Sequence, residues 1–294
     1  MMRKYLSGHD GYMKALFLIC ASISIFATGM ILLFIFSSSL PAFREIGVRG
    51  ILFSARWMPN VMDPAAGDYG MLAFLNGTIL TTLGGLLLGA PLAIGTVVFI
   101  DQFAPGRVRN VILRGMELLA GIPSVVIGWF GLTLLVPVIA RLTGTSGYGI
   151  LAASIVLAVM TLPTITALGA EALKSLPPSL EQASLAMGAT RWQTVRRVLL
   201  PAARRGLLVA VILGMGRAIG ETMAVQMVVG NARQLAFSLT QRTSTLTSRI
   251  VTDMGESSGV FRSALFAQGL VLLVLAMFLI VAVRLTVRER KGRR

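Results

Sequence analysis

Residues 177–201, PPSLEQASLAMGATRWQTVRRVLLP, lie between two long apolar stretches and carry the most informative spacing in the chain. A run of small residues precedes Gly188 and predicts a helix that ends there, because glycine readily adopts the left-handed conformation that closes a helix. Trp192, Val195 and Leu199 recur at helical spacing and predict a second short helix with one apolar face. The segment therefore predicts two short helices hinged at Gly188, a shape suited to a groove on a partner protein.

Composition places the rest of the chain in a membrane. Of its 294 residues, 55% are apolar and 13% charged, and the apolar residues form long blocks. About 20 apolar residues are needed to cross the roughly 30 Å of hydrocarbon in a bilayer. We expect an all-α integral membrane protein, a single transmembrane domain over residues 1–294. The six expected transmembrane helices are 15–39, 73–100, 115–140, 150–170, 207–230 and 265–285.

The first of these spans is expected to remain as an N-terminal anchor. Its apolar run is too long for the core of a signal peptide, and no small-residue cleavage site follows it. Cys20 lies within this span and is the only cysteine in the chain, which excludes an intramolecular disulfide.

Basic residues are distributed unevenly about the six spans. The formal net charge is +15. If both termini lie on one side, that side carries 18 Lys and Arg residues and the other carries eight. This asymmetry follows the positive-inside rule, so the termini and a loop at 171–206 are predicted to be cytoplasmic. The basic tail at 288–294 is expected to meet anionic membrane lipid, and we expect no nucleic-acid partner.

Two longer segments, 41–72 and 231–264, are expected on the opposite side. The first contains Trp57 and Tyr69 together with prolines and predicts an ordered cap. The second is rich in Ser and Thr, and we expect it either to fold over a pore mouth or to meet an extracytoplasmic partner. Neither segment has the spacing of a catalytic site.

The fifth span carries the strongest candidates for a substrate pathway, which are Arg217, Glu221 and the adjacent Thr222. A charge at the centre of a membrane helix costs about 2.5–3.5 kcal/mol on insertion scales, so such residues are functional candidates. Arg217 and Glu221 are four residues apart, and on a continuous helix they would share a face and neutralise each other. A guanidinium suits a tetrahedral oxyanion, although the pair could simply lock two spans together. The neighbouring residues that would let a ligand approach are Gly214, Gly216 and Gly220.

The third span contains a proline that should break or kink it. Pro123 cannot donate a backbone hydrogen bond and crowds the preceding turn. Broken helices in membranes are tolerated where they line a cavity, and helix N-termini there favour anions. Ser124 and Glu117 are therefore further pathway candidates, with a simple packing kink as the alternative.

The quoted loop resembles the coupling loop of ABC importer permeases, whose signature is Glu-Ala-Ala…Gly…Ile-x-Leu-Pro. Gly188 stands at the glycine of that signature. The first triad departs from it, because Gln182 replaces the glutamate and Glu181 stands one position early. The resemblance implies that the loop docks on an ATPase subunit; an ordinary amphipathic juxtamembrane helix is the alternative. The residues assigned to this docking role are Glu181, Gln182, Ala183, Ser184, Gly188, Arg191, Trp192, Leu200 and Pro201.

Three motifs, MELLAGIPSVVIGWFG, AMGATRWQTV within the quoted loop, and GRAIGETMAVQMVVGN, are similar to those of the PstC family of bacterial phosphate importers. The resemblance extends over most of residues 57–285. It implies the type I (MetI-like) ABC importer fold and a multi-pass location in the bacterial inner membrane. It also implies a PstA-like sister permease, a PstB-like ATPase dimer that binds ATP and Mg, and a PstS-like periplasmic phosphate-binding protein. On this basis we expect a permease subunit that moves inorganic phosphate into the cytoplasm.

Several alternatives remain open. The substrate could be another oxyanion, such as sulfate, molybdate or phosphonate, and the permease could be a homodimer. A secondary anion transporter would not need the 177–201 loop. The chain has no GxxxxGK[ST] phosphate loop, so ATP hydrolysis is assigned to a partner and this chain needs no cofactor. An intramembrane enzyme is disfavoured because the single histidine, His9, lies in the N-terminal tail, and no metal site is expected.

Overall fold

A computed structural model describes residues 2–60 and 62–288 of the chain. Residues 289–294 of the basic tail lie outside this range. The helices and strands are α1 (Met2–Glu45), α2 (Val48–Phe53), β1 (Trp57–Met58), β2 (Asp68–Tyr69), α3 (Leu72–Gln102), α4 (Gly106–Gly121), α5 (Ser124–Phe130), α6 (Val136–Thr143), α7 (Ile150–Lys174), α8 (Pro178–Ala186), α9 (Arg191–Thr194), α10 (Leu200–Gly220), α11 (Met223–Val228), α12 (Leu246–Asp253) and α13 (Gly259–Arg288).

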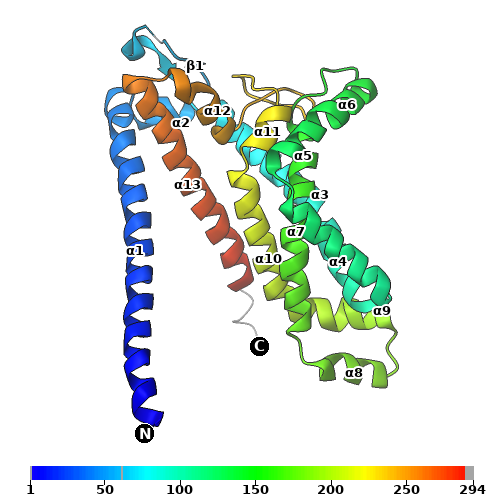
Figure 1. Ribbon diagram of the computed structural model, residues 1–294. Coiled ribbons are helices and arrows are strands. Elements are labelled where there is room, and N and C mark those ends of the chain that lie inside the picture. Colours follow the sequence, from blue (N-terminus) through cyan, green and yellow to red (C-terminus); the bar gives the residue numbers. More distant parts are fainter. Residues whose placement is uncertain (1, 61, 289–294) are drawn as a thin grey trace.

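The expected all-helical membrane architecture is confirmed. Within the described residues, six helices are long and apolar enough to cross a bilayer. They are Tyr12–Glu45, Leu72–Gln102, Ser124–Thr143, Ile150–Lys174, Arg191–Gly220 and Gly259–Leu285. The start of α1, helix α8 and the end of α13 lie at one end of the molecule, which we call the α8 end (Figure 1). The short strands, α2 and α12 lie at the opposite end, which we call the cap end.

Helices α3, α7 and α10 form the packed centre. Glycines on α3 allow close approach to α7, because a Cβ at Gly85 would lie 2.7 Å from Leu157 Cβ. A Cβ at Gly214 of α10 would lie 2.5 Å from the side chain of Ile165 on α7. Close packing without large side chains is a common way to associate helices where the surrounding lipid is as apolar as the helices themselves.

Helix α1 is peripheral. It packs mainly against α13, where the rings of Phe34 and Phe266 meet edge to face at 5.4 Å. None of the most apolar window of the span Tyr12–Glu45 is buried within the chain. Helices α1 and α13 diverge toward the α8 end, so that part of α1 stands away from the packed centre (Figure 1).

The third span is broken at Pro123, as its sequence predicts. Helix α4 ends at Gly121, and the chain resumes as α5 at Ser124, after an extended Ile122 and Pro123. A π-helical turn at Gly131–Leu135 then joins α5 to α6. The expected boundary of this span was wrong, since residues 115–121 belong to α4 and the membrane-length helix begins at Ser124.

The fifth span also differs from expectation. Its helix is continuous from Arg191 to Gly220 and does not extend as one helix to residue 230. Glu221 has extended backbone angles, φ −70° and ψ 121°, and α11 starts only at Met223. The second half of the expected span is therefore a separate short helix at the cap end.

The expected ordered cap is confirmed. Strands β1 and β2 pair antiparallel, with Trp57 opposite Tyr69. Trp57 is 2% exposed, and its ring meets Tyr69, Phe74 and Phe261 edge to face. Residues of the second outer segment pack onto this aromatic core through Leu246. The Ser- and Thr-rich segment is thus folded into the cap, and its buried polar residues include Thr243, Ser244, Thr245, Thr247 and Ser248.

Candidate functional site

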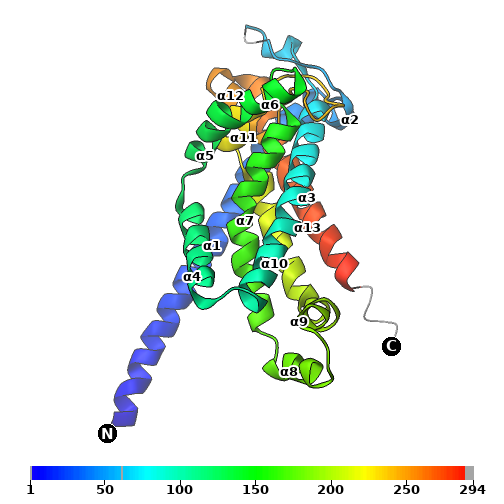
Figure 2. The same cartoon turned by 90° about the vertical axis from the view of Figure 1, so that its right-hand side faces the viewer.

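The loop at the α8 end forms an elbow, visible at the bottom of Figure 2. Gly188 has φ +81°, the left-handed conformation expected from the sequence. Helix α8 is closed around it by backbone bonds from Gly188 N to Leu185 O and from Ala189 N to Ser184 O. A Cβ on Gly188 would meet no atom within 4 Å, so the glycine is required by its backbone conformation and not by space.

Side-chain bonds hold the second arm of the elbow. Thr190 caps α9 in a capping box, accepting from Gln193 N while Gln193 Oε1 accepts from Thr190 N. The hydroxyls of Ser184 and Thr194 lie 2.9 Å apart and tie α8 to α9. Arg191 Nη1 donates to Gln102 O at the end of α3. These contacts fix the angle of α8 relative to the membrane helices.

Helix α8 buries none of its own residues, so its surface is free for a partner. Of the proposed docking residues, Glu181, Ser184 and Leu200 are half-buried. The exposed members of the set are Gln182, Ala183, Gly188, Arg191, Trp192 and Pro201. The structure therefore presents most of this set on one accessible elbow.

Two expectations for the elbow were wrong. The second helix is not short, because α9 continues through a π-helical turn at Val195–Leu199 into α10. The three apolar residues also do not form one buried face. Val195 and Leu199 are buried against α3 and α7, whereas Trp192 is 57% exposed. The elbow therefore has two arms of unequal length. One is the short, exposed helix α8, and the other is the long helix from Arg191 to Gly220, which extends into the membrane domain.

The expected ion pair between Arg217 and Glu221 is absent from the described residues, whose two ion pairs are Arg56–Asp68 and Arg249–Asp253. The cause is the end of α10 at Gly220, which takes Glu221 off the helical face of Arg217. Arg217 is exposed in the isolated chain and Glu221 is half-buried. A Cβ added at Gly216 or at Gly220, the glycines nearest Arg217 on α10, would meet no atom within 4 Å.

Polar contacts surround this break between α10 and α11. Glu221 Oε1 accepts from Ala224 N at 3.4 Å, and Thr222 Oγ1 donates to Gly220 O at 3.2 Å. Thr247 Oγ1 of α12 donates to Glu221 O at 3.3 Å. The break is therefore held from the cap end by α12.

The two broken spans meet. A Cβ on Gly128 of α5 would lie 2.7 Å from Ala224 Cα of α11, so the two helices are in close contact. Ser124 opens α5 and is half-buried. Glu117 lies on α4, before the break, and is exposed. Ser124 thus belongs to the helix that packs against α11, and Glu117 does not.

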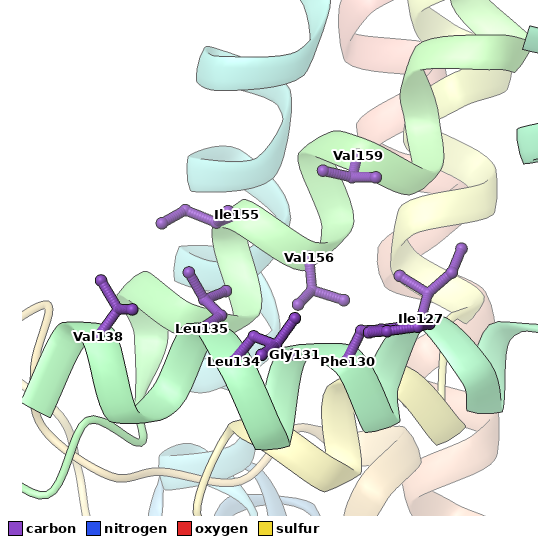
Figure 3. Close-up of a pocket in the computed structure, with 9 residues that line it drawn as sticks. All are labelled: Ile127, Phe130, Gly131, Leu134, Leu135, Val138, Ile155, Val156 and Val159. Carbon is purple, nitrogen blue, oxygen red and sulfur yellow. The ribbon is translucent and has the colours of Figure 1, made fainter. Parts of the chain in front are cut away.

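A groove of about 370 Å³ lies between the α5–α6 helix and α7 (Figure 3). Its nine lining residues are all apolar, among them Phe130, Leu134 and Val159, and their side chains converge in Figure 3. Such a surface offers an anion no hydrogen-bond donor. Among the described residues, no group of three His, Cys, Asp or Glu side chains gathers as a metal site would require.

The sequence analysis missed the buried pair Arg249–Asp253 of α12. Arg249 Nη1 and Asp253 Oδ1 are 3.0 Å apart, and the two side chains are 3% and 6% exposed. Arg249 Nη2 also donates to Asn231 O and to Ser244 Oγ. Burial lowers the pKa of Arg249, and the charge of Asp253 opposes that shift. The four-residue spacing of an arginine and an aspartate was the available signal.

Six membrane-length helices, with chain breaks just before the third and just after the fifth, and an exposed elbow at one end define the permease subunit of an ABC importer. Residues 85–291 match the binding-protein-dependent transport system inner membrane components. The chain belongs to this family, whose members are multi-pass permease components and not catalytic chains.

Two relatives agree with this assignment, and a solved structure agrees with the fold. The chain is 45% identical over 277 residues to the probable ABC transporter permease protein YqgH of Bacillus subtilis, covering 92% of this chain and 89% of the relative. It is 34% identical to the phosphate transport system permease protein PstC of Xylella fastidiosa, covering 82% and 80%. The fold matches an inward-facing MetNI methionine ABC transporter with TM-score 0.59 at 22% identity, covering 74% of this chain and 96% of that chain.

Proposed function

We propose that this chain is a PstC-like subunit that carries inorganic phosphate into the cytoplasm. The observation that carries the proposal is Arg217, an exposed guanidinium beside the break of the fifth span, with open space at Gly216 and Gly220. A charged side chain on an open face of a membrane helix needs a partner chain, water or an ion to face. The PstC relatives support phosphate as that ion, whereas the name of the 45% identical Bacillus subtilis relative specifies no substrate.

The pathway is proposed to run between this chain and a PstA-like sister permease. Arg217 supplies donors and positive charge to the phosphate oxygens. Glu221 is not paired with Arg217, so it can accept a hydrogen bond from a phosphate hydroxyl. Thr222 and Ser124 are proposed to contribute further hydroxyls. Glu117, on α4, is a weaker candidate because it lies before the break.

Energy is proposed to enter through the elbow. Helix α8 and the exposed Trp192 dock on a PstB-like ATPase dimer that binds ATP and Mg. The continuous helix from Arg191 to Gly220 connects this docking surface directly to Arg217. A PstS-like binding protein delivers phosphate to the cap end, and both termini are proposed to be cytoplasmic.

Uptake of radiolabelled phosphate into cells that depend on this permease tests the proposal. Arg217→Lys keeps the charge but loses the planar fork of donors, so we expect uptake at a small fraction of the parent rate. Arg141→Lys, an exposed arginine at the end of α6, is the matched control and should transport normally.

The same assay decides between substrates. Excess unlabelled phosphate should compete with the label, and sulfate, molybdate or phosphonate should not. If one of those oxyanions competed and phosphate did not, that oxyanion would be assigned as the substrate in place of phosphate. Uptake that continues without the ATPase would assign the chain to secondary transport. Normal uptake by Arg217→Lys would reduce Arg217 to a structural residue.

A further inference from the structure

A second groove, of about 340 Å³, lies on the surface of the cap end. It is lined by residues from two segments far apart in the sequence, Ala55, Arg56, Trp57, Met58, Arg233 and Gln234. All of them lie outside the six membrane-length helices. The groove therefore faces the aqueous side of the membrane and not the lipid.

The groove is positively charged and poorly neutralised. Arg56 lies 3.5 Å from Asp68, but their side chains are 71% and 56% exposed, and such surface pairs contribute little. Arg233 is exposed, and neither ion pair among the described residues includes it. Two guanidinium groups at one groove attract a carboxylate, with which arginine forms bidentate hydrogen bonds.

Apolar side chains line the groove together with the arginines. Met58 is 58% exposed, and Ala55 and Trp57 complete the apolar part of the lining. Arginine, methionine and aromatic residues are the types enriched at the centres of protein–protein interfaces. A free anion would need the arginines but not this apolar surround, so the surface fits an acidic protein partner.

One lining residue of the groove, Trp57, is connected to the pathway by hydrogen bonds. Trp57 is 2% exposed, and its indole N–H donates to Asp253 Oδ2 at 2.8 Å. Asp253 ends α12, the helix whose Thr247 donates to Glu221 O at the α10–α11 break. The groove is therefore linked to Glu221 through hydrogen bonds at the two ends of one short helix.

From these observations we infer that the groove docks the solute-binding protein of the importer through a carboxylate side chain seated between Arg56 and Arg233. The inference rests on the proposed function, in that it requires the cap end to face outward. It assigns the partner's recognition surface, in which the exposed Met58 lies with the two arginines.

Direct binding tests the inference. The solute-binding protein encoded with this permease is labelled with a fluorophore and titrated onto the assembled importer in lipid nanodiscs. Arg56→Glu and Arg233→Glu should each weaken binding about tenfold, and added salt should weaken binding to the parent complex more than to the variants. Arg141→Glu, outside the groove at the same end, should bind like the parent.

A compensating change sharpens the test. Acidic residues on the surface of the binding protein are replaced by arginine one at a time, and one of these variants should restore binding to Arg233→Glu. Parent-like binding by both groove variants, or no binding by the parent, would overturn the inference. The inference would also be overturned if the groove variants bound the solute-binding protein normally but showed a changed dependence of uptake on phosphate concentration. That result would assign the groove to the free anion. A parent that binds the protein but carries no phosphate would contradict only the proposed substrate.

Discussion

The indole N–H of Trp57 donates to Oδ2 of Asp253 at 2.8 Å, although the two residues are 196 positions apart in the sequence. The other oxygen of the same carboxylate accepts from Arg249 at 3.0 Å. One buried carboxylate thus joins β1 to α12 and neutralises the most deeply buried arginine of the cap.

Replacing Asp253 should therefore destabilise the protein. Asp253→Asn leaves the buried Arg249 without a counter-charge, and breaking a buried pair in this way typically costs about 3–5 kcal/mol. We expect a clearly lower Tm for the purified permease in detergent. Asp68→Asn removes the exposed pair with Arg56 and should cost at most about 1 kcal/mol. Equal Tm values for the two variants would contradict the central role of the Arg249 pair.

Gly77 of α3 should tolerate no side chain. A Cβ at this position would lie 2.1 Å from Ser244 O, a backbone atom of the cap, so Gly77→Ala must displace the 231–245 segment. Overpacking of this kind costs about 1–3 kcal/mol. Gly95→Ala on the same helix meets no atom within 4 Å and should be neutral or slightly stabilising. Thermal unfolding of the two variants, compared side by side, measures the difference.

Gly188 should be replaceable only by residues that accept positive φ. Gly188→Val strains the left-handed backbone by roughly 1–2 kcal/mol and should lower substrate-stimulated ATP hydrolysis by the assembled complex. Gly188→Asn should retain most of it, since asparagine adopts this conformation more easily. The measurement is the ATPase rate at matched expression. Parent-like hydrolysis by Gly188→Val would remove the elbow from the coupling mechanism.

The orientation can be tested with cysteines in a Cys20→Ser background. Met62 and Phe237 at the cap end are 96% and 86% exposed, and Ser179 on α8 is also exposed. Met62→Cys and Phe237→Cys should react with an impermeant thiol reagent in intact cells, and Ser179→Cys should react only after the cells are opened. The opposite pattern would place the elbow outside the cell. Ser244 is unsuitable as a reporter, because it is fully buried.

The features predictable from sequence were those that depend on nearby residues. Long apolar blocks set the number of spans, Pro123 set the break before α5, and Gly188 set the left-handed turn. The same reasoning failed for Arg217 and Glu221, because the intervening sequence Ala218-Ile219-Gly220 does not by itself specify that α10 ends at Gly220. The end of α10 at Gly220 coincides with a tertiary contact, Thr247 to Glu221 O, that local propensity cannot contain.

The cap shows the same limit on a larger scale. Arg249 lies in a polar, Ser- and Thr-rich segment that reads as exposed, yet it is 2% exposed. Its burial arises from packing against the aromatic residues of the first outer segment and α3, including Phe74, over whose ring the guanidinium lies at 5.3 Å. Hydrophobic patterning reports only local sequence. It cannot identify a polar segment whose burial depends on tertiary contacts with residues far away in the chain.

The uninterrupted helix from Arg191 to Gly220 has a mechanical consequence. Its 30 residues form a stiff rod about 45 Å long, clamped where Leu199, Ala203 and Leu207 are buried, and its Arg191 end carries the elbow. A tilt of about 5° around such a clamp moves an end by about 2 Å, on the scale of a rod of this length. That displacement is enough to stretch the 3.3 Å contact between Thr247 and Glu221 beyond hydrogen-bonding range. A small tilt of this rod would therefore uncouple α12 from the break beside Arg217.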